Sequence, residues 1–423
     1  MKSHTPLQIT PVEKENRILY LDILRGIAVF FILIANLYFF CGWMFFSEQM
    51  KAEFTSYRVD TIIEYFTGIF VDEKFYSIFS ILFGIGFVIQ FNALQKRNMS
   101  FAPFFRKRMA GLLLFGLLHL FFLWMGDILS LYALLGFVLI WFRNHSDKKL
   151  LRWAAFLLFL PVIHLLAMII TGSFYPLMLF DNFEHYWTSL EFPTRDFRNM
   201  GRPEPDILYF LQTGNFSEFF NLLIRTPIIR LALILIEGRA FKVLACFLIG
   251  IWAGRQILNG NLLQNTRLLK KIALWGFIIG IPMNLLMVFS QEQGRGVWTL
   301  VDYLSNALGV VPLASAYAAS IALWARSNPK FLNWFAPVGR MALSNYVFQS
   351  VVGVIIFYGI GLGYATKLGL WKVMLIGVVI FTGQIIFSSY WLKRFKYGPM
   401  EWLWRTMTYG KFIKNKQLAN LKQ

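Results

Sequence analysis

Residues 23–43 read ILRGIAVFFILIANLYFFCGW, with only two strongly polar residues, Arg25 and Asn36. A helix needs about 20 mostly apolar residues to cross the hydrocarbon core of a bilayer, so this run is long enough to span one. Further runs of this kind lie at 75–94, 109–124, 128–142, 153–173, 240–258, 272–290, 301–325, 341–363 and 371–391. The sequence therefore predicts an all-α, polytopic membrane protein, a helical bundle with about ten transmembrane helices.

The composition indicates the same class of protein. Hydrophobic residues make up 57% of the 423-residue chain and charged residues only 15%, whereas a soluble domain carries roughly 25% charged residues. The two cysteines, Cys41 and Cys246, both lie in apolar runs, so we expect no disulfide framework, no metal site and no prosthetic group. This composition excludes soluble enzymes, secreted disulfide-rich domains and disordered proteins.

The formal net charge is +19, from 41 Lys and Arg residues against 22 Asp and Glu residues. In a soluble protein this excess would indicate a nucleic-acid partner. Here the basic residues gather in short loops between apolar runs and form no basic aromatic platform, so we expect the lipid bilayer as partner and no nucleic acid. Most Lys and Arg residues fall in segments that lie inside if the N-terminus is cytoplasmic. Both termini are therefore predicted to be cytoplasmic.

The apolar runs divide the chain into five parts. These are a cytoplasmic N-terminal segment (1–22), a five-helix transmembrane half (23–173), an outer-face loop (174–239), a second five-helix half (240–392) and a basic cytoplasmic tail (393–423). Within the loop, residues 216–236 are apolar but interrupted by Arg225, Pro227 and Arg230. These residues would be costly at the bilayer centre, so we expect an interfacial or re-entrant helix there. The third and fourth runs meet at 124–127, which predicts a tight hairpin.

Polar side chains within the apolar runs indicate an internal site, because a polar group that faces lipid is costly. At about 1.5 Å of rise per residue, they fall into two layers. The outer layer comprises Asn36, His119, Asp127, Asn284, Asp302 and Asn306, and the inner layer comprises Asp22, Arg25, Gln90, Arg340, Ser344, Asn345 and Gln349. We expect these side chains to face one shared chamber inside the bundle.

Each candidate has a functional and a structural interpretation. His119 is the candidate general base, because Asp127 is near enough along the hairpin to orient its imidazole. Alternatively, His119 makes an interhelical hydrogen bond that holds the hairpin together. Asn36 could stabilise an oxyanion or hold two helices together. Asp22 and Arg25 are three residues apart, a spacing that allows an ion pair along one helix, whether structural or part of a site.

Several motifs resemble those of a known family. They are Arg17-Ile-Leu-Tyr-Leu-Asp22-Ile-Leu-Arg25-Gly26-Ile-Ala followed by Asn36, Phe75-Tyr-Ser-Ile-Phe-Ser-Ile-Leu-Phe-Gly84, Gly116-Leu-Leu-His119, Leu123-Trp-Met-Gly126-Asp127, Gly339-Arg340-Met-Ala-Leu-Ser344-Asn345-Tyr346-Val-Phe-Gln349-Ser350 and Gly398-Pro-Met-Glu401-Trp402-Leu-Trp404-Arg405. In this order they cover nearly the whole chain, and they are similar to the YeiB-type bacterial membrane proteins, the domain of unknown function 418 family. The resemblance implies a multipass protein of the bacterial cell (plasma) membrane.

The opening at residues 21–28 is also distantly similar to that of transmembrane acyltransferases, such as lysosomal heparan glucosaminide acetyltransferase. Those enzymes carry an acyl group from cytoplasmic acyl-CoA to an external sugar. The resemblance implies acyl-CoA as the donor, a small-molecule or glycan acceptor, and a site role for Asn36, which matches the family's asparagine. The family's catalytic histidine follows that asparagine, but residues 37–60 here contain no histidine. His119 is the substitute candidate.

Membrane acyl transfer is the first functional hypothesis. Arg25 and Arg340 would bind the CoA phosphates on the cytoplasmic side, His119 with Asp127 would deprotonate the acceptor, and Asn36 would stabilise the oxyanion. The acceptor would enter from outside, near the acidic loop at 181–206. Further substrate-binding candidates are Asp22, Asn345, Gln349, Asp302 and Asn306.

Two other classes of function remain open. A transporter or exporter of a small solute would use the same polar side chains to line a pathway, although the chain has no internal repeat of the kind that many transporters share. A non-catalytic scaffold or sensor would read a ligand through the outer loop.

Overall fold

The computed structural model describes residues 18–173, 175–176, 178, 206–294, 296–327 and 330–417. Its helices are α1 (Leu19–Phe40), α2 (Glu48–Ala52), α3 (Tyr57–Phe70), α4 (Lys74–Gln95), α5 (Phe101–Phe122), α6 (Leu129–Leu139), α7 (Asp147–Thr171), α9 (Asp206–Gln212), α10 (Phe216–Ile236), α11 (Arg239–Leu258), α12 (Asn261–Gln264), α13 (Thr266–Glu292), α14 (Val297–Ala325), α15 (Phe335–Arg340), α16 (Ala342–Phe357), α17 (Leu370–Arg394) and α18 (Pro399–Tyr409). Within these ranges there is no strand, only an isolated bridge between Phe395 and Lys416. The predicted all-α fold is confirmed.

Each predicted apolar run coincides with a helix over most of its length. Seven helical segments are long and apolar enough to cross a membrane, or eight if the bent pair Lys330–Arg340 and Ala342–Phe357 forms one span. Helix α5 is also long, but it carries the basic residues 106–108, and α6 is short. The chain is thus a multipass membrane protein. The predicted run 341–363 is too long, because α16 stops at Phe357. At its other end, α16 is bent by 80° from the helical segment that precedes it.

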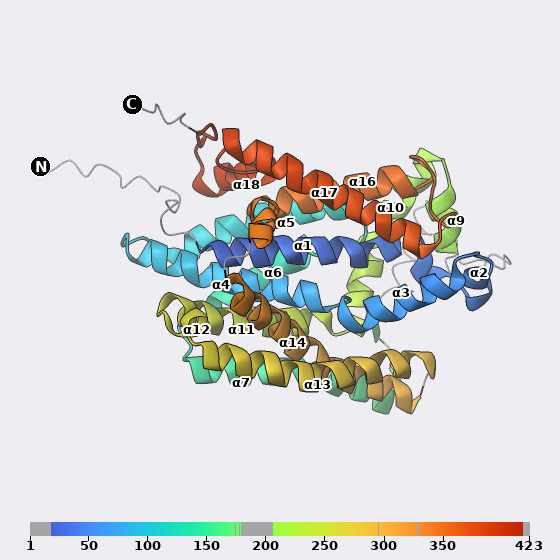
Figure 1. Ribbon diagram of the computed structural model, residues 1–423, viewed down its shortest axis with the longest axis horizontal. Coiled ribbons are helices and arrows are strands. Elements are labelled where there is room, and N and C mark those ends of the chain that lie inside the picture. Colours follow the sequence, from blue (N-terminus) through green and yellow to red (C-terminus); the bar gives the residue numbers. More distant parts are fainter. Residues whose placement is uncertain are drawn as a thin grey trace, which may run out of the picture.

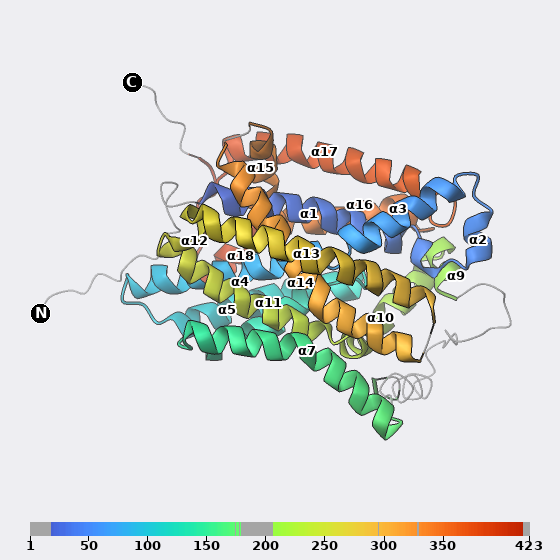
Figure 2. The same cartoon turned by 60° about the horizontal axis from the view of Figure 1, so that its bottom comes forward.

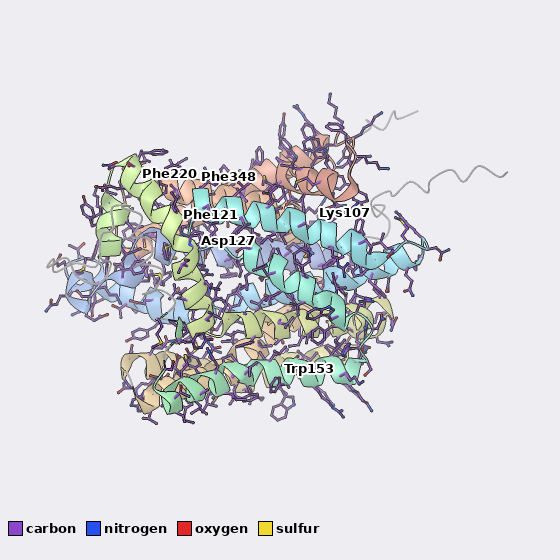
Figure 3. The ribbon with its side chains drawn as sticks, turned by 180° about the vertical axis from the view of Figure 1, so that it is seen from behind. Lys107, Phe121, Asp127, Trp153, Phe220 and Phe348 are labelled. Carbon is purple, nitrogen blue, oxygen red and sulfur yellow. The ribbon has the colours of Figure 1, made fainter. Side chains whose placement is uncertain are left out.

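Most helices lie side by side, with α1, α4, α11 and α14 inside the bundle and α7, α13 and α17 on its outside (Figures 1 and 2). The apolar windows of the inner spans are 50–56% buried, whereas those of the outer three are only 28–33% buried. Outer side chains such as Trp153 on α7 point away from the bundle (Figure 3). Lipid would cover these outer faces, since an exposed apolar surface of this size is unfavourable in water.

The two ends of the bundle differ. Helix α1 begins, α17 ends and α18 lies at the end on the left of Figure 1, which we call the terminal end. Helices α2 and α9 lie at the opposite end, which we call the far end. Helix α10 runs obliquely across the other helices (Figure 3), so the stretch at 216–236 is helical, as predicted, and oriented unlike the spans. The acidic residues at 181–205 lie outside the described residues.

Two glycines bring α15 onto the first turns of α1. A Cβ atom added to Gly339 would overlap the carbonyl oxygen of Asp22, and one added to Gly26 would overlap that of Phe335. Only glycine allows two backbones to approach this closely. The contact places Arg340, the last residue of α15, at the terminal end beside Asp22 and Arg25.

Candidate functional site

A cavity of about 630 Å³, the central cavity, lies inside the bundle. Its wall is charged towards both ends and apolar between them, where Phe83, Phe87, Phe105, Met109 and Leu112 line it. Of the residues predicted from sequence, it is lined by Asp22, Arg25, Asn36, Gln90, Arg340 and Gln349. The lining does not include His119, Asp127, Asn284, Asp302, Asn306, Ser344 or Asn345. The cavity therefore brings together only some of the polar side chains that we expected to face one shared chamber.

Towards the terminal end, arginines dominate the wall. These terminal-end arginines are Arg25, Arg97, Arg108, Arg340 and Arg405. Of the two carboxylates beside them, Asp22 accepts a hydrogen bond from Arg25 over 2.9 Å. Glu401 accepts from the Leu343 and Ser344 amides at the start of α16, over 2.7 and 3.1 Å. Among the residues that the structure describes, the positive charge lining this end therefore exceeds the negative charge.

Neither Arg108 nor Arg405 forms an ion pair with a carboxylate in the described part of the chain. Each guanidinium lies over an aromatic ring, with Arg108 3.6 Å from the Trp404 centroid and Arg405 4.4 Å from that of Tyr397. Arg108 is near enough to Arg405 for the two charges to repel. Repulsion between like charges is strong in surroundings of low dielectric constant. Stacked arginines with unsatisfied charge suit a planar or multiply charged anion.

Glu401, on α18, lies outside the membrane-spanning helices. Burial raises the pKa of its carboxyl group, and the hydrogen bonds from Ser344 partly offset that effect. The carboxyl group therefore takes up a proton at a higher pH than an exposed glutamate does. When it does so, the terminal end becomes more positive still.

Further towards the far end, a second charged cluster interrupts the apolar wall at the break between α3 and α4. Glu73 accepts a hydrogen bond from Lys242 of α11 over 2.7 Å, and another from the amide of Asn306 on α14. The backbone of Glu73 has a φ of +65°, a left-handed conformation that costs a non-glycine residue roughly 1–2 kcal/mol. Strain of this kind concentrates at functional sites.

Sequence reasoning missed this cluster. The signal available was the charged triplet 72–74 between two apolar stretches, together with Lys242 inside a predicted span. Intramembrane charges are expected to have partners. The partners themselves lie 169 and 233 residues away along the chain.

His119 and Asp127 come together as predicted, but behind the cavity wall. Nδ1 of His119 lies 3.1 Å from Oδ1 of Asp127, at an angle that makes the contact electrostatic rather than a hydrogen bond. Nε2 lies 2.9 Å from Oγ of Ser350 on α16. The rings of Trp124 and Tyr346 pack against the imidazole, and these two do line the cavity. One layer of side chains thus separates His119 from the cavity.

Asp127 also shapes the hairpin. Its carboxylate accepts from the amides of Leu129 and Ser130 at the start of α6, over 3.1 and 2.8 Å. On the other side, its carbonyl oxygen accepts from Nε of Arg230 on α10 over 3.3 Å, and Figure 3 shows Asp127 beside that helix. The residue therefore ties α5, α6 and α10 together.

The other predicted residues hold helices to one another. Asn345 donates to Oγ of Ser388 over 3.0 Å, and Gln349 donates to Gln384 over 2.8 Å, so both tie α16 to α17. Asp302 and Asn306 share a face of α14 but have different partners. Asp302 accepts from Gln291 over 3.0 Å, whereas Asn306 reaches the Glu73 cluster.

These contacts predict unequal effects of mutation at the hairpin. Asp127→Ala leaves the amides of Leu129 and Ser130 without their acceptor and removes the carboxylate beside the buried imidazole of His119, so we expect it to cost about 3 kcal/mol of stability. Ser350→Ala removes one neutral hydrogen bond, and we expect it to cost about 1 kcal/mol. Thermal unfolding of both variants in detergent measures the difference. Equal midpoints of unfolding would show that Asp127 does not hold the hairpin.

Comparisons with known proteins find relatives of unknown function. Residues 253–411 match a family model described as "Protein of unknown function (DUF418)". The uncharacterized protein YxaH of Bacillus subtilis is 30% identical over 425 residues, which covers 95% of this chain and 96% of YxaH. The uncharacterized protein YeiB of Escherichia coli is 25% identical over 410 residues, covering 92% and 95% of the two chains. No solved structure matches the chain.

Proposed function

We propose that this chain, which belongs to the DUF418 family of proteins of unknown function, is a membrane acyltransferase that takes its acyl group from acyl-CoA. One observation carries the proposal: a single cavity joins a surplus of arginine charge to an apolar passage that leads to Asn36. Acyl-CoA has the complementary form, with phosphates at one end, a long uncharged arm, and the thioester at the other end.

The proposal includes an orientation. The terminal end faces the cytoplasm of a bacterial cell, where acyl-CoA is found, and the acceptor arrives from the far end. The excess of Lys and Arg in the segments assigned to the inside supports this orientation. The terminal-end arginines then hold the phosphates as forked donors.

Asn36 and His119 have defined parts in the reaction. The acceptor's nucleophilic atom bonds to the thioester carbonyl carbon, the C–S bond breaks, and CoA leaves as the thiolate. Asn36 donates a hydrogen bond to the oxyanion that develops on the carbonyl oxygen. His119 acts through Tyr346 and Trp124, whose rings it supports at the cavity wall, so we assign it a positioning role.

The test uses purified protein in detergent with acetyl-CoA and octanoyl-CoA. We expect both to bind by calorimetry and to release free CoA thiol slowly, with water as the acceptor. Asn36→Ala is expected to slow thiol release by about 100-fold or more while it leaves donor affinity unchanged. Asn284→Ala is the matched control, because Asn284 is buried away from the cavity and donates within its own helix.

Absence of acyl-CoA binding to the wild-type protein at millimolar concentration would overturn the proposal. Transport is the second candidate function, because charged groups line the cavity towards both ends. Solute flux in proteoliposomes, without any affinity for acyl-CoA, would favour transport.

A further inference from the structure

We propose that Asp72 is the general base that activates the acceptor, and that the cavity wall around it binds a small molecule bearing a hydroxyl group or an amine. This inference rests on the proposed acyl transfer and adds to it the group that removes the acceptor's proton. Transfer to an oxygen or nitrogen nucleophile needs such a group within reach of the reacting atoms. His119 lies behind the wall and cannot meet that requirement.

Elimination among the carboxylates of the cavity wall selects Asp72. Five described carboxylates line the cavity: Asp22, Asp72, Glu73, Glu237 and Glu401. Asp22 binds Arg25, and Glu73 binds Lys242. Glu237 binds Arg239 over 2.6 Å, and Glu401 caps α16. The carboxylate of Asp72 makes no hydrogen bond or ion pair with any residue the structure describes, and its side chain is exposed.

The backbone fixes Asp72 while leaving its carboxylate available. Helix α3 ends at Phe70 and α4 begins at Lys74, so Asp72 lies in the short break between them. Its amide donates to the carbonyl oxygen of Thr67 over 2.8 Å. The neighbouring Glu73 is held by Lys242 and Asn306. A base on a rigid support loses little entropy when it meets its substrate.

The nearest cation does not neutralise Asp72. Lys74 is fully buried, and its ammonium group donates to the carbonyl oxygen of Gly68 over 2.7 Å, back towards the end of α3. The charges of Arg239 and Lys242 also act on Asp72, but both cations are already paired with glutamates. The carboxyl group of Asp72 therefore stays accessible at the cavity wall.

The cavity wall also offers a hydrogen-bond donor. Arg230 of α10 lines the cavity and donates through Nε to the carbonyl oxygen of Asp127. Its terminal N–H groups make no hydrogen bond with the residues the structure describes, so they can donate to a ligand. A wall with one free carboxylate and one guanidinium suits an uncharged hydroxylated molecule or an amine, which needs both an acceptor and a donor.

The chemical step balances with the groups named. The lone pair of the acceptor oxygen or nitrogen forms a bond to the thioester carbonyl carbon while Asp72 takes the proton from that atom. The tetrahedral intermediate collapses, the C–S bond breaks, and CoA leaves as a thiolate. The proton then passes from Asp72 to water, so the carboxylate is restored for the next turnover.

The test compares donor binding with turnover in the full-length protein. The probes are acetyl-CoA as donor, with water, glycerol and ethanolamine as acceptors, and the readouts are calorimetric affinity and release of CoA thiol. We expect Asp72→Asn and Asp72→Ala to bind acetyl-CoA as the wild type does and to lose 100-fold or more of the rate. Added formate is expected to restore part of the rate in Asp72→Ala but none in Asp72→Asn, where the amide fills the site. Glu53→Gln, an exposed carboxylate at the same end but off the cavity, is the control.

The outcomes separate the inference from the proposed function. If the Asp72 variants bind and turn over acetyl-CoA as the wild type does, the inference is wrong and the proposed function stands. Loss of donor binding in these variants would make Asp72 structural, which also overturns the inference. Failure of the wild type to bind or cleave acetyl-CoA overturns both.

Discussion

Replacement of both Arg108 and Arg405 by glutamine is expected to weaken acyl-CoA binding by about 100-fold or more. A charge-assisted hydrogen bond contributes about 1.5–3 kcal/mol, and each 1.4 kcal/mol corresponds to a factor of about ten in affinity. The two guanidinium groups line the same end of the cavity and have no carboxylate partner among the described residues. Their loss therefore removes guanidinium donors that no carboxylate among the described residues occupies. Isothermal titration calorimetry with acetyl-CoA measures the change.

The same double variant is not expected to lower stability. Arg108 and Arg405 repel each other when no anion is bound, so their neutralisation removes an unfavourable term that offsets the lost contact with Trp404. We expect the midpoint of thermal unfolding to stay the same or rise. Arg152→Gln, an exposed arginine on α7 outside the cavity, is the control. Unchanged affinity in the double variant would mean that these arginines bind no phosphate.

Conservative lysine variants refine this result. Lysine keeps the charge but lacks the planar fork of arginine. We therefore expect Arg405→Lys to retain part of the affinity, with a steeper loss as salt concentration rises. If charge alone sufficed, the lysine variant would bind as tightly as the wild type.

The helices were predictable because their signal is local. Each apolar run carries its own length and hydropathy, so 23–43 and 153–173 identify spans without knowledge of their neighbours. The hairpin at 124–127 and the ion pair between Asp22 and Arg25 were predictable for the same reason, since a few residues separate the partners. The end of α16 was not predictable, because the apolar sequence continues past the turn that stops it.

The site was predictable only in part. Hydropathy identifies the depth of a polar residue along its helix but not the direction in which its side chain points. Asn36 and Asn284 therefore looked equivalent in sequence, yet Asn36 lines the cavity and Asn284 bonds to its own helix. His119 contacts Asp127, as predicted, but no sequence pattern indicated that Tyr346 would lie between these two residues and the cavity. Packing between segments that are distant in the sequence decides which way these side chains point, and this packing cannot be read from a single sequence.

The Glu73–Lys242 pair illustrates what that packing adds to stability. The two side chains are only 14% and 6% exposed, and their atoms lie 2.7 Å apart. Removing one partner of a buried ion pair leaves an uncompensated charge, which typically costs 3–5 kcal/mol. Glu73 keeps the amide of Asn306 and borders the cavity, so we expect Lys242→Met to cost about 3 kcal/mol, at the lower limit of that range. Thermal unfolding in detergent should show the midpoint fall by roughly 5 °C.

The double variant Glu73→Gln with Lys242→Met is the decisive companion. It removes both charges and keeps a side chain that can still bond to Asn306, so most of the lost stability should return, as it does when a buried pair is replaced whole. Lys270→Met, an exposed lysine on α13, should unfold like the wild type. If the double variant is no more stable than Lys242→Met, the penalty does not come from an unpaired Glu73. Lys242 would then stabilise the bundle by packing its aliphatic stem between α4 and α11. Side-chain packing, rather than the pairing of charges, would then account for the charged cluster at the cavity wall.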